Sequence, residues 1–196
     1  MKLSLAKVIS IILNPMAVAL FAPFLVIYRS TLDVNAAIYW SLYTLIFVFV
    51  MTVIVATGVR KKIFTDLDVS RREQRPIIFL IGILFTAVYI LSLFFLHAPF
   101  ILYVLAVGVI LGVSIVGLIN RRVKASVHVA AVTALILPVA FSFGHYYLLL
   151  LLLIPLIAWA RLKTKRHTLT EILVGGAVGG LLSMSIYLTV KFFLNR

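Results

Sequence analysis

The sequence contains no cysteine and only five acidic residues, against 18 lysines and arginines. The absence of cysteine excludes disulfides, thiolate nucleophiles and cysteine-ligated metals. The formal net charge of +13 is not gathered in a basic tail or an aromatic-basic platform, so no nucleic-acid partner is expected. The few carboxylates also argue against any reaction that needs two acidic clusters to hold a metal ion.

Long apolar runs make up most of the chain. Hydrophobic residues account for 64% of the 196 positions, and the mean hydropathy is +1.23, whereas a soluble domain is about half apolar. Runs of roughly 18 or more apolar residues predict membrane-spanning helices. We therefore expect one all-α domain over residues 1–196, a polytopic transmembrane helical bundle of six or seven spans. The predicted spans are Val8–Tyr28, Ala36–Val59, Ile77–Leu96, Phe100–Ile119, Ser126–Phe143, Tyr146–Ala160 and Thr170–Leu194.

The basic residues divide unequally between the two membrane sides that these spans define. Fifteen of the 18 lysines and arginines fall on the side of the N-terminus. They are Lys2, Lys7, Arg60, Lys61, Lys62, Arg71, Arg72, Arg75, Arg121, Arg122, Lys124, Arg161, Lys163, Lys165 and Arg166. By the positive-inside rule, this face of a multi-pass cell-membrane protein lies in the cytoplasm, where it would also contact anionic membrane phospholipids. Seven spans would place the C-terminus outside.

Proline and glycine predict where the helices bend and where they approach one another. Proline lacks the N–H that a helix interior requires, so four bends are expected. They lie at Asn14-Pro15, Pro23, Pro138 and Pro155. The last span also contains four glycines spaced as two overlapping small-xxx-small pairs, which let helices pack closely within the bundle or between copies in a homo-oligomer. They are Gly175, Gly176, Gly179 and Gly180.

The most informative polar residues lie near the C-terminus: Arg161, His167 and Glu171. His167 and Glu171 are four apart, so they would share one face of a helix. A carboxylate beside an imidazole fixes its tautomer and makes one ring nitrogen a better base or nucleophile. Arg161 could bind an oxyanion through two parallel hydrogen bonds. An anion-binding arginine, an activated histidine and an orienting acid together suggest phosphoryl chemistry.

Two further polar segments are expected on the same membrane face, because the spans between them form hairpins that leave the face and return to it. One covers residues 66–76 and the other residues 124–128. They would supply further cations for a phosphate, a serine that could cap a helix and a second histidine. The residues concerned are Arg72, Arg75, Lys124, Ser126 and His128.

In order and spacing, the three segments resemble the motifs of the type-2 phosphatidic acid phosphatase superfamily, a group of membrane lipid phosphatases. The family pattern is a lysine, six residues and Arg-Pro; then Pro-Ser-Gly-His; then Ser-Arg, five residues, a histidine, three residues and an aspartate. This chain has Arg75-Pro76, Ala125-Ser126-Val127-His128, and Ala160-Arg161 followed at the same spacing by His167 and Glu171. The resemblance covers about residues 60–180.

The chain departs from the family pattern at several positions. Asp68 stands where the family lysine would fall, and Arg71 or Arg72 could replace that lysine. Four further positions carry a different residue from the family. They are Ala125 for proline, Val127 for glycine, Ala160 for serine and Glu171 for aspartate.

The resemblance implies a role for each site residue. His167 would attack phosphorus and carry a phosphohistidine, Glu171 would orient it, and His128 would protonate the leaving alkoxide and later activate water. The phosphate oxygens would be bound by Arg75, Arg161, Arg72, Ser126 and Lys124. No metal or other cofactor is expected. The implied activity is metal-independent hydrolysis of a lipid phosphate or polyprenyl (di)phosphate by a fold with the type-2 phosphatidic acid phosphatase core.

Other functions remain open. A non-catalytic lipid-binding or transport relative of the same fold would account for the altered second motif. A magnesium-dependent prenyltransferase would use Asp66 and Asp68 to hold a metal-diphosphate, although such enzymes need a second acid cluster that five acidic residues do not supply. Alternatively, the basic residues could serve only to set the orientation of the protein in the membrane, and His128 and His167 would then have no functional role.

Overall fold

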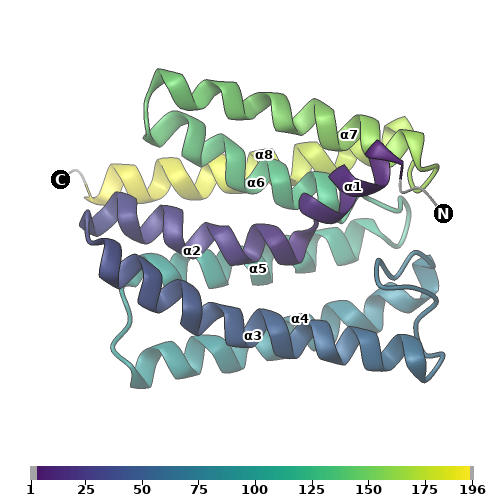
Figure 1. Ribbon diagram of the computed structural model, residues 1–196, viewed down its shortest axis with the longest axis horizontal. Helices are drawn as coiled ribbons and strands as arrows, with labels where there is room; N and C mark the ends of the chain where they lie inside the picture. Colours follow the sequence, from purple (N-terminus) through teal and green to yellow (C-terminus); the bar gives the residue numbers. More distant parts are fainter. Residues whose placement is uncertain (1–3, 195–196) are drawn as a thin grey trace. The chain divides into compact units, whose positions relative to one another are not determined.

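The computed structural model describes residues 4–194, which form eight α-helices, two 3₁₀ segments and no strand (Figure 1). This confirms the predicted all-α class. The elements are α1 (Leu5–Ile12), α2 (Pro15–Thr31), α3 (Val34–Arg60), η1 (Arg72–Gln74), α4 (Arg75–Phe95), α5 (Phe100–Ile119), α6 (Val127–Ser142), η2 (His145–Leu152), α7 (Leu153–Lys163) and α8 (Leu169–Leu194).

The protein is a multi-pass membrane protein. Within the described residues, five helical segments are long and apolar enough to cross a bilayer, and α1 with α2 would make a sixth if the pair forms one span. The five are α3, η1 with α4, α5, η2 with α7, and α8. The sequence predicts six or seven spans, and a count of seven would require the fifth apolar run to be a full span. That run forms α6, which has only 16 residues, where a typical span needs about 20.

The first predicted span is bent where the sequence places Asn14-Pro15. The axes of α1 and α2 differ by 47°. The Asn14 side-chain oxygen accepts a hydrogen bond from the Ala17 N–H at 2.7 Å, and Pro15 takes the first helical position, where no N–H is needed. The bend predicted here is therefore confirmed, whereas α2 and α6 continue as helices through Pro23 and Pro138.

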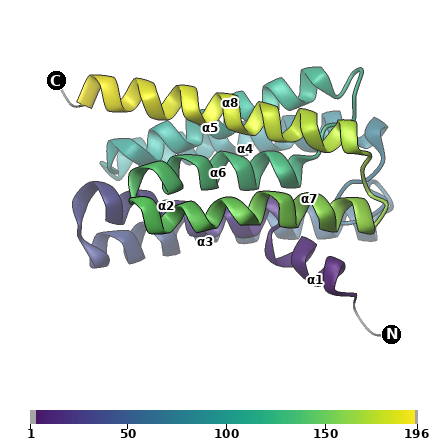
Figure 2. The ribbon, with the colours of Figure 1, turned by 90° about the horizontal axis from the view of Figure 1, so that it is seen from above.

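The chain divides into two compact units. The terminal unit comprises Met1–Val18 and Val123–Arg196. In it, α6 packs along both α8 and α7, and α1 packs on α7 (Figure 2). Its apolar core draws on all four helices. The buried core residues are Ala6, Val129, Val132, Ile136, Ile157, Ala160 and Ile172.

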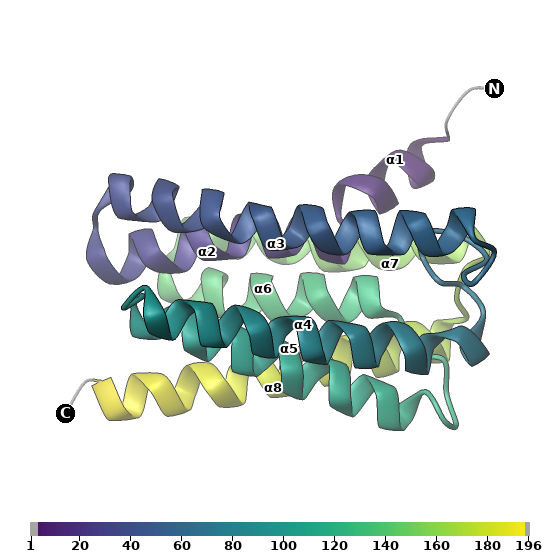
Figure 3. The same ribbon diagram turned by 90° about the horizontal axis from the view of Figure 1, so that it is seen from below.

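The central unit comprises Ala19–Arg122. Here α4 packs along α5, and α3 also contacts α4 (Figure 3). The buried core of this unit includes two aromatic residues, Trp40 and Tyr89, which pack with Leu93. The hydroxyl groups of Tyr89 and Thr44 lie 2.8 Å apart in a buried hydrogen bond, which satisfies both polar groups in an apolar bundle.

Candidate functional site

The polar residues of the terminal unit gather where three helix ends meet: the start of α6, the end of α7 and the start of α8. The Ser126 N–H donates to the Glu171 carbonyl oxygen at 3.0 Å. The Lys124 ammonium donates to the Arg166 carbonyl oxygen at 3.2 Å. These bonds join residues 124–128 to residues 161–171, so two of the three polar segments expected to meet lie together.

His167 and Glu171 form the predicted contact, although His167 precedes α8 (Leu169–Leu194) and does not share a helical face with Glu171. His167 Nδ1 lies 2.8 Å from Glu171 Oε2, and the His167 side chain is only 1% exposed. When the carboxylate is ionised, Nδ1 carries the proton and donates to it, which leaves the lone pair on Nε2. The pair therefore provides an oriented imidazole whose Nε2 can act as a nucleophile or base.

Glu171 also belongs to a capping box at the start of α8. Its Oε2 accepts the Thr168 N–H at 3.2 Å, and the Thr168 hydroxyl accepts the Glu171 N–H at 3.4 Å. This reciprocal pattern satisfies two N–H groups that the first helical turn leaves without partners. A single carboxylate thus fixes both the helix start and the imidazole, so the position of His167 is set by the geometry of α8 itself.

Three other predicted site residues of this unit are buried. His128 is 6% exposed, Arg161 is 3% exposed, and Ser126 is fully buried. Ser126 is the N-cap residue of α6, yet its side chain makes no capping hydrogen bond. Within the described residues its hydroxyl oxygen has no hydrogen-bond partner. Buried hydroxyls normally have a hydrogen-bond partner. Because the Ser126 hydroxyl has none in the described residues, it can donate a hydrogen bond to a bound oxyanion.

A Schellman motif positions Arg161 relative to His167. The last turn of α7 closes with hydrogen bonds from the Lys165 N–H to the Leu162 carbonyl at 2.9 Å and from the Arg166 N–H to the Arg161 carbonyl at 3.2 Å. Lys165 takes the left-handed conformation that this motif requires, with φ 54°, although glycine is the usual residue there. The motif reverses the chain, so that Arg161 at the end of α7 is followed at once by the start of α8.

Replacing Lys165 with glycine is expected to raise the free energy of unfolding by about 0.5–1 kcal/mol, because glycine adopts positive φ without the steric cost that other residues incur. Lys163→Gly removes the same exposed charge two residues earlier, but within α7, and should lower stability by up to about 1 kcal/mol. Equilibrium unfolding of the detergent-solubilised variants measures both. Equal effects of the two changes would show that charge, not conformation, decides stability at this turn.

Two glycines hold α6 and α8 in backbone contact beside the site. A Cβ atom on Gly175 would lie 2.5 Å from the Ser126 carbonyl oxygen, and one on Gly179 would lie 2.8 Å from the Ala130 carbonyl carbon. Real Cβ atoms do not approach other atoms this closely. The Gly175 and Gly179 pair of the predicted small-xxx-small pattern therefore packs within the chain. This contact fixes the position of Ser126 along α8.

The first polar segment belongs to the central unit, where two of its three arginines contact Asn120. The Arg75 side chain is 4% exposed and donates to the Asn120 side-chain oxygen at 3.2 Å and to the Val69 carbonyl at 3.4 Å. The Arg72 side chain donates to the Asn120 carbonyl, and the Asn120 amide donates back to the Arg72 carbonyl at 3.4 Å. Val69 is held at φ 44°, an uncommon conformation for a β-branched residue.

These contacts tie the start of α4 to the end of α5. They also show that both arginines serve a structural purpose in the central unit. Their combination with His128, His167 and Arg161 in one phosphate site stays a prediction.

The Asp66 carboxylate, considered above as half of a metal-binding pair, forms a turn. It accepts the Asp68 N–H at 2.9 Å and the Ser70 hydroxyl at 3.0 Å. Among residues 4–194, no group of three histidine, aspartate or glutamate side chains is placed to hold a metal ion. The local role of Asp66 is therefore to shape the loop that leads to Arg72 and Arg75.

Sequence reasoning missed two residues that organise the sites. Thr168 could have been found from the Thr-x-x-Glu spacing of a capping box. Asn120 carries no sequence signal beyond being a polar residue at the end of an apolar span, and only the contacts of Arg72 and Arg75 identify it. The chain matches no protein-family model, no curated protein and no solved structure.

Proposed function

We propose that the protein is a membrane-embedded hydrolase that removes phosphate from a lipid phosphate or polyprenyl (di)phosphate through a phosphohistidine. The observation that carries this proposal is the 2.8 Å contact between His167 Nδ1 and Glu171, in a unit that also buries His128, Arg161 and Ser126. The motif resemblance to the type-2 phosphatidic acid phosphatase superfamily supports the same assignment.

The proposed reaction has two steps. In the first, His167 Nε2 attacks phosphorus, the bond from phosphorus to the lipid oxygen breaks, and protonated His128 donates its proton to the leaving alkoxide. In the second, His128 takes a proton from water, the resulting hydroxide attacks the phosphohistidine, and inorganic phosphate leaves. Glu171 stabilises the imidazolium that forms in between, as an acid does beside any catalytic histidine.

In the transition state negative charge is spread over the three equatorial phosphate oxygens and the leaving oxygen, so fixed donors directed at these atoms lower the barrier. Arg161 and Ser126 supply a cation and a hydroxyl from the terminal unit, and Lys124 adds a second cation at its edge. We further propose that the basic face of the terminal unit lies in the cytoplasm.

The activity test uses purified protein with lipid monophosphates and prenyl diphosphates in mixed micelles. Release of inorganic phosphate that persists in EDTA, together with an acid-labile and alkali-stable phosphoprotein trapped during turnover, is the expected result. Activity that requires magnesium and condenses prenyl groups would favour the prenyltransferase alternative. No phosphate release from any member of the panel would overturn the proposal.

A second function has a specific observation in its favour. Arg72 and Arg75 are engaged by Asn120 and by the Val69 carbonyl, as they would be in a lipid-binding or transport protein that no longer needs them for catalysis. Tight binding of a lipid phosphate without turnover, unchanged when His128 and His167 are both replaced by alanine, would support this alternative.

A further inference from the structure

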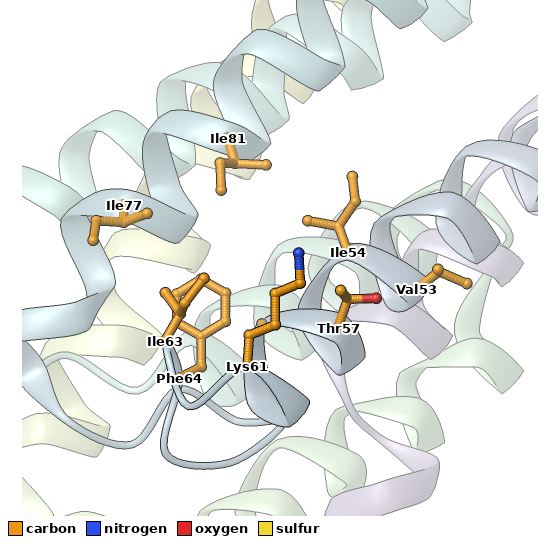
Figure 4. A pocket seen from close by; sticks show the side chains of 9 residues that line it. Val53, Ile54, Thr57, Lys61, Ile63, Phe64, Ile77 and Ile81 are labelled. Atoms are coloured by element: carbon orange, nitrogen blue, oxygen red, sulfur yellow. The ribbon is translucent and has the colours of Figure 1, made fainter.

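A cavity of about 330 Å³ opens in the central unit between the last turns of α3 and the first turns of α4 (Figure 4). Its volume lies in the range of about 300–1,000 Å³ that is typical of small-molecule sites. None of the site residues considered above lines it. The lining residues are Val53, Ile54, Thr57, Gly58, Lys61, Ile63, Phe64, Ile77 and Ile81.

The floor of this cavity is built by the turn that ends α3. Lys62 takes a left-handed conformation with φ 60°, and the Ile63 N–H donates to the Gly58 carbonyl at 2.9 Å, as in a Schellman motif. The turn brings the Phe64 ring, which is 3% exposed, against Gly58. A Cβ atom on Gly58 would lie 2.6 Å from Phe64 Cε2 and closer still to Cδ2, so a larger residue would displace the ring that forms the floor.

The walls are apolar and open, and one charged group extends among them. Val53 is 46% exposed, and Ile63 and Ile77 are each 50% exposed. Figure 4 shows the Lys61 side chain reaching back along α3, with its ammonium nitrogen directed toward the apolar side chains. Within residues 4–194 this ammonium group has no ion-pair partner. A cation beside an apolar surface requires a counter-charge or water.

We propose that the cavity binds one acyl chain of an anionic phospholipid, with the lipid phosphate on Lys61 Nζ. The apolar walls fit a hydrocarbon chain, and the ammonium group fits the phosphate that the glycerol of the same lipid carries. Arg60 and Lys62, on either side of Lys61 in the sequence, add the basic surroundings that attract anionic headgroups. Charge complementarity selects this occupant over a neutral lipid or an apolar helix. The site takes a phosphodiester lipid, so it does not depend on the proposed hydrolysis.

The test compares binding of phosphatidylglycerol and phosphatidylcholine to the full chain, measured by titration of the purified protein in mild detergent. Wild-type protein should bind phosphatidylglycerol more tightly. Lys61→Ala should weaken binding of phosphatidylglycerol about fivefold, the effect of one cation at a membrane surface, and leave phosphatidylcholine unchanged. Ile81→Trp should fill the cavity and weaken binding of both lipids. Lys191→Ala removes an exposed lysine of α8 and serves as the charge-matched control.

A phosphatidylglycerol with a photoactivatable group in its acyl chain gives a second, independent readout. In nanodiscs of phosphatidylcholine and this probe, adducts should map to residues 53–64 and 77–81, and Ile81→Trp should remove them while the protein still elutes as a folded species. Equal loss of binding in Lys61→Ala and Lys191→Ala would overturn the proposal, because it would indicate only general charge attraction. Conversion of a dimer to a monomer by Ile81→Trp would also overturn it, since a second copy would then occupy the cavity.

Discussion

His167→Ala is expected to reduce phosphate release by about 10⁴- to 10⁶-fold, the largest effect of any single change in this chain. Removing the nucleophile of a covalent mechanism abolishes the two-step route, and what survives comes from substrate binding and charge stabilisation alone. The measurement is the rate of inorganic phosphate release from the best lipid substrate, with trapping of the phosphoprotein in parallel. The trapped intermediate should disappear completely.

The matched control for this variant is His145→Ala, which removes an exposed histidine from η2 of the same unit. Its activity should equal that of the unaltered protein. Unfolding must be measured for both variants, because His167 is buried and contacts Glu171. A folded His167→Ala protein that still releases phosphate at the original rate would rule out His167 as the nucleophile.

The terminal unit shows how far residue spacing alone can predict a site. The four-residue interval between His167 and Glu171 predicts that the two side chains meet on one face of a helix. They do meet, but His167 lies two residues before α8 begins at Leu169, and the contact forms because the capping box of Thr168 directs the Glu171 carboxylate back toward the imidazole. The hairpin argument also brings Ser126 to the start of α8, since two antiparallel spans return to the same face. These features are local or depend only on topology, and such features are readable from a sequence.

Features that depend on three-dimensional packing were not readable in the same way. The 16-residue length of α6 could not be separated from a full span by hydropathy, because apolar residues continue into the turns at both of its ends. Asn120 acquires its role only through two arginines 48 and 45 positions away. The cavity beside Lys61 arises from a glycine and a phenylalanine that meet across a turn, and the sequence does not indicate this turn because Lys62, not glycine, takes its left-handed position.

Gly175→Ala is expected to be strongly destabilising, although it removes no chemical group. Its Cβ would lie 2.5 Å from the Ser126 carbonyl oxygen and 3.1 Å from the Ser126 nitrogen, both of them backbone atoms that cannot rotate away. The helices α6 and α8 would have to separate, with a loss of about 1–3 kcal/mol in the free energy of unfolding. The Ser126 N–H bond to the Glu171 carbonyl would be broken by the same movement, so phosphate release should fall as well.

The adjacent Gly176 supplies the control, because it faces side chains rather than backbone. A Cβ there would lie 3.6 Å from Val129 Cγ1 and 4.0 Å from Thr133 Oγ1, which is ordinary contact. Gly176→Ala should therefore keep full activity and gain up to about 1 kcal/mol from the better helix propensity of alanine. Thermal unfolding and phosphate release, measured on both variants, separate the two effects. If the consecutive substitutions behave alike, the helix propensity of α8 controls stability and close backbone contact with α6 does not.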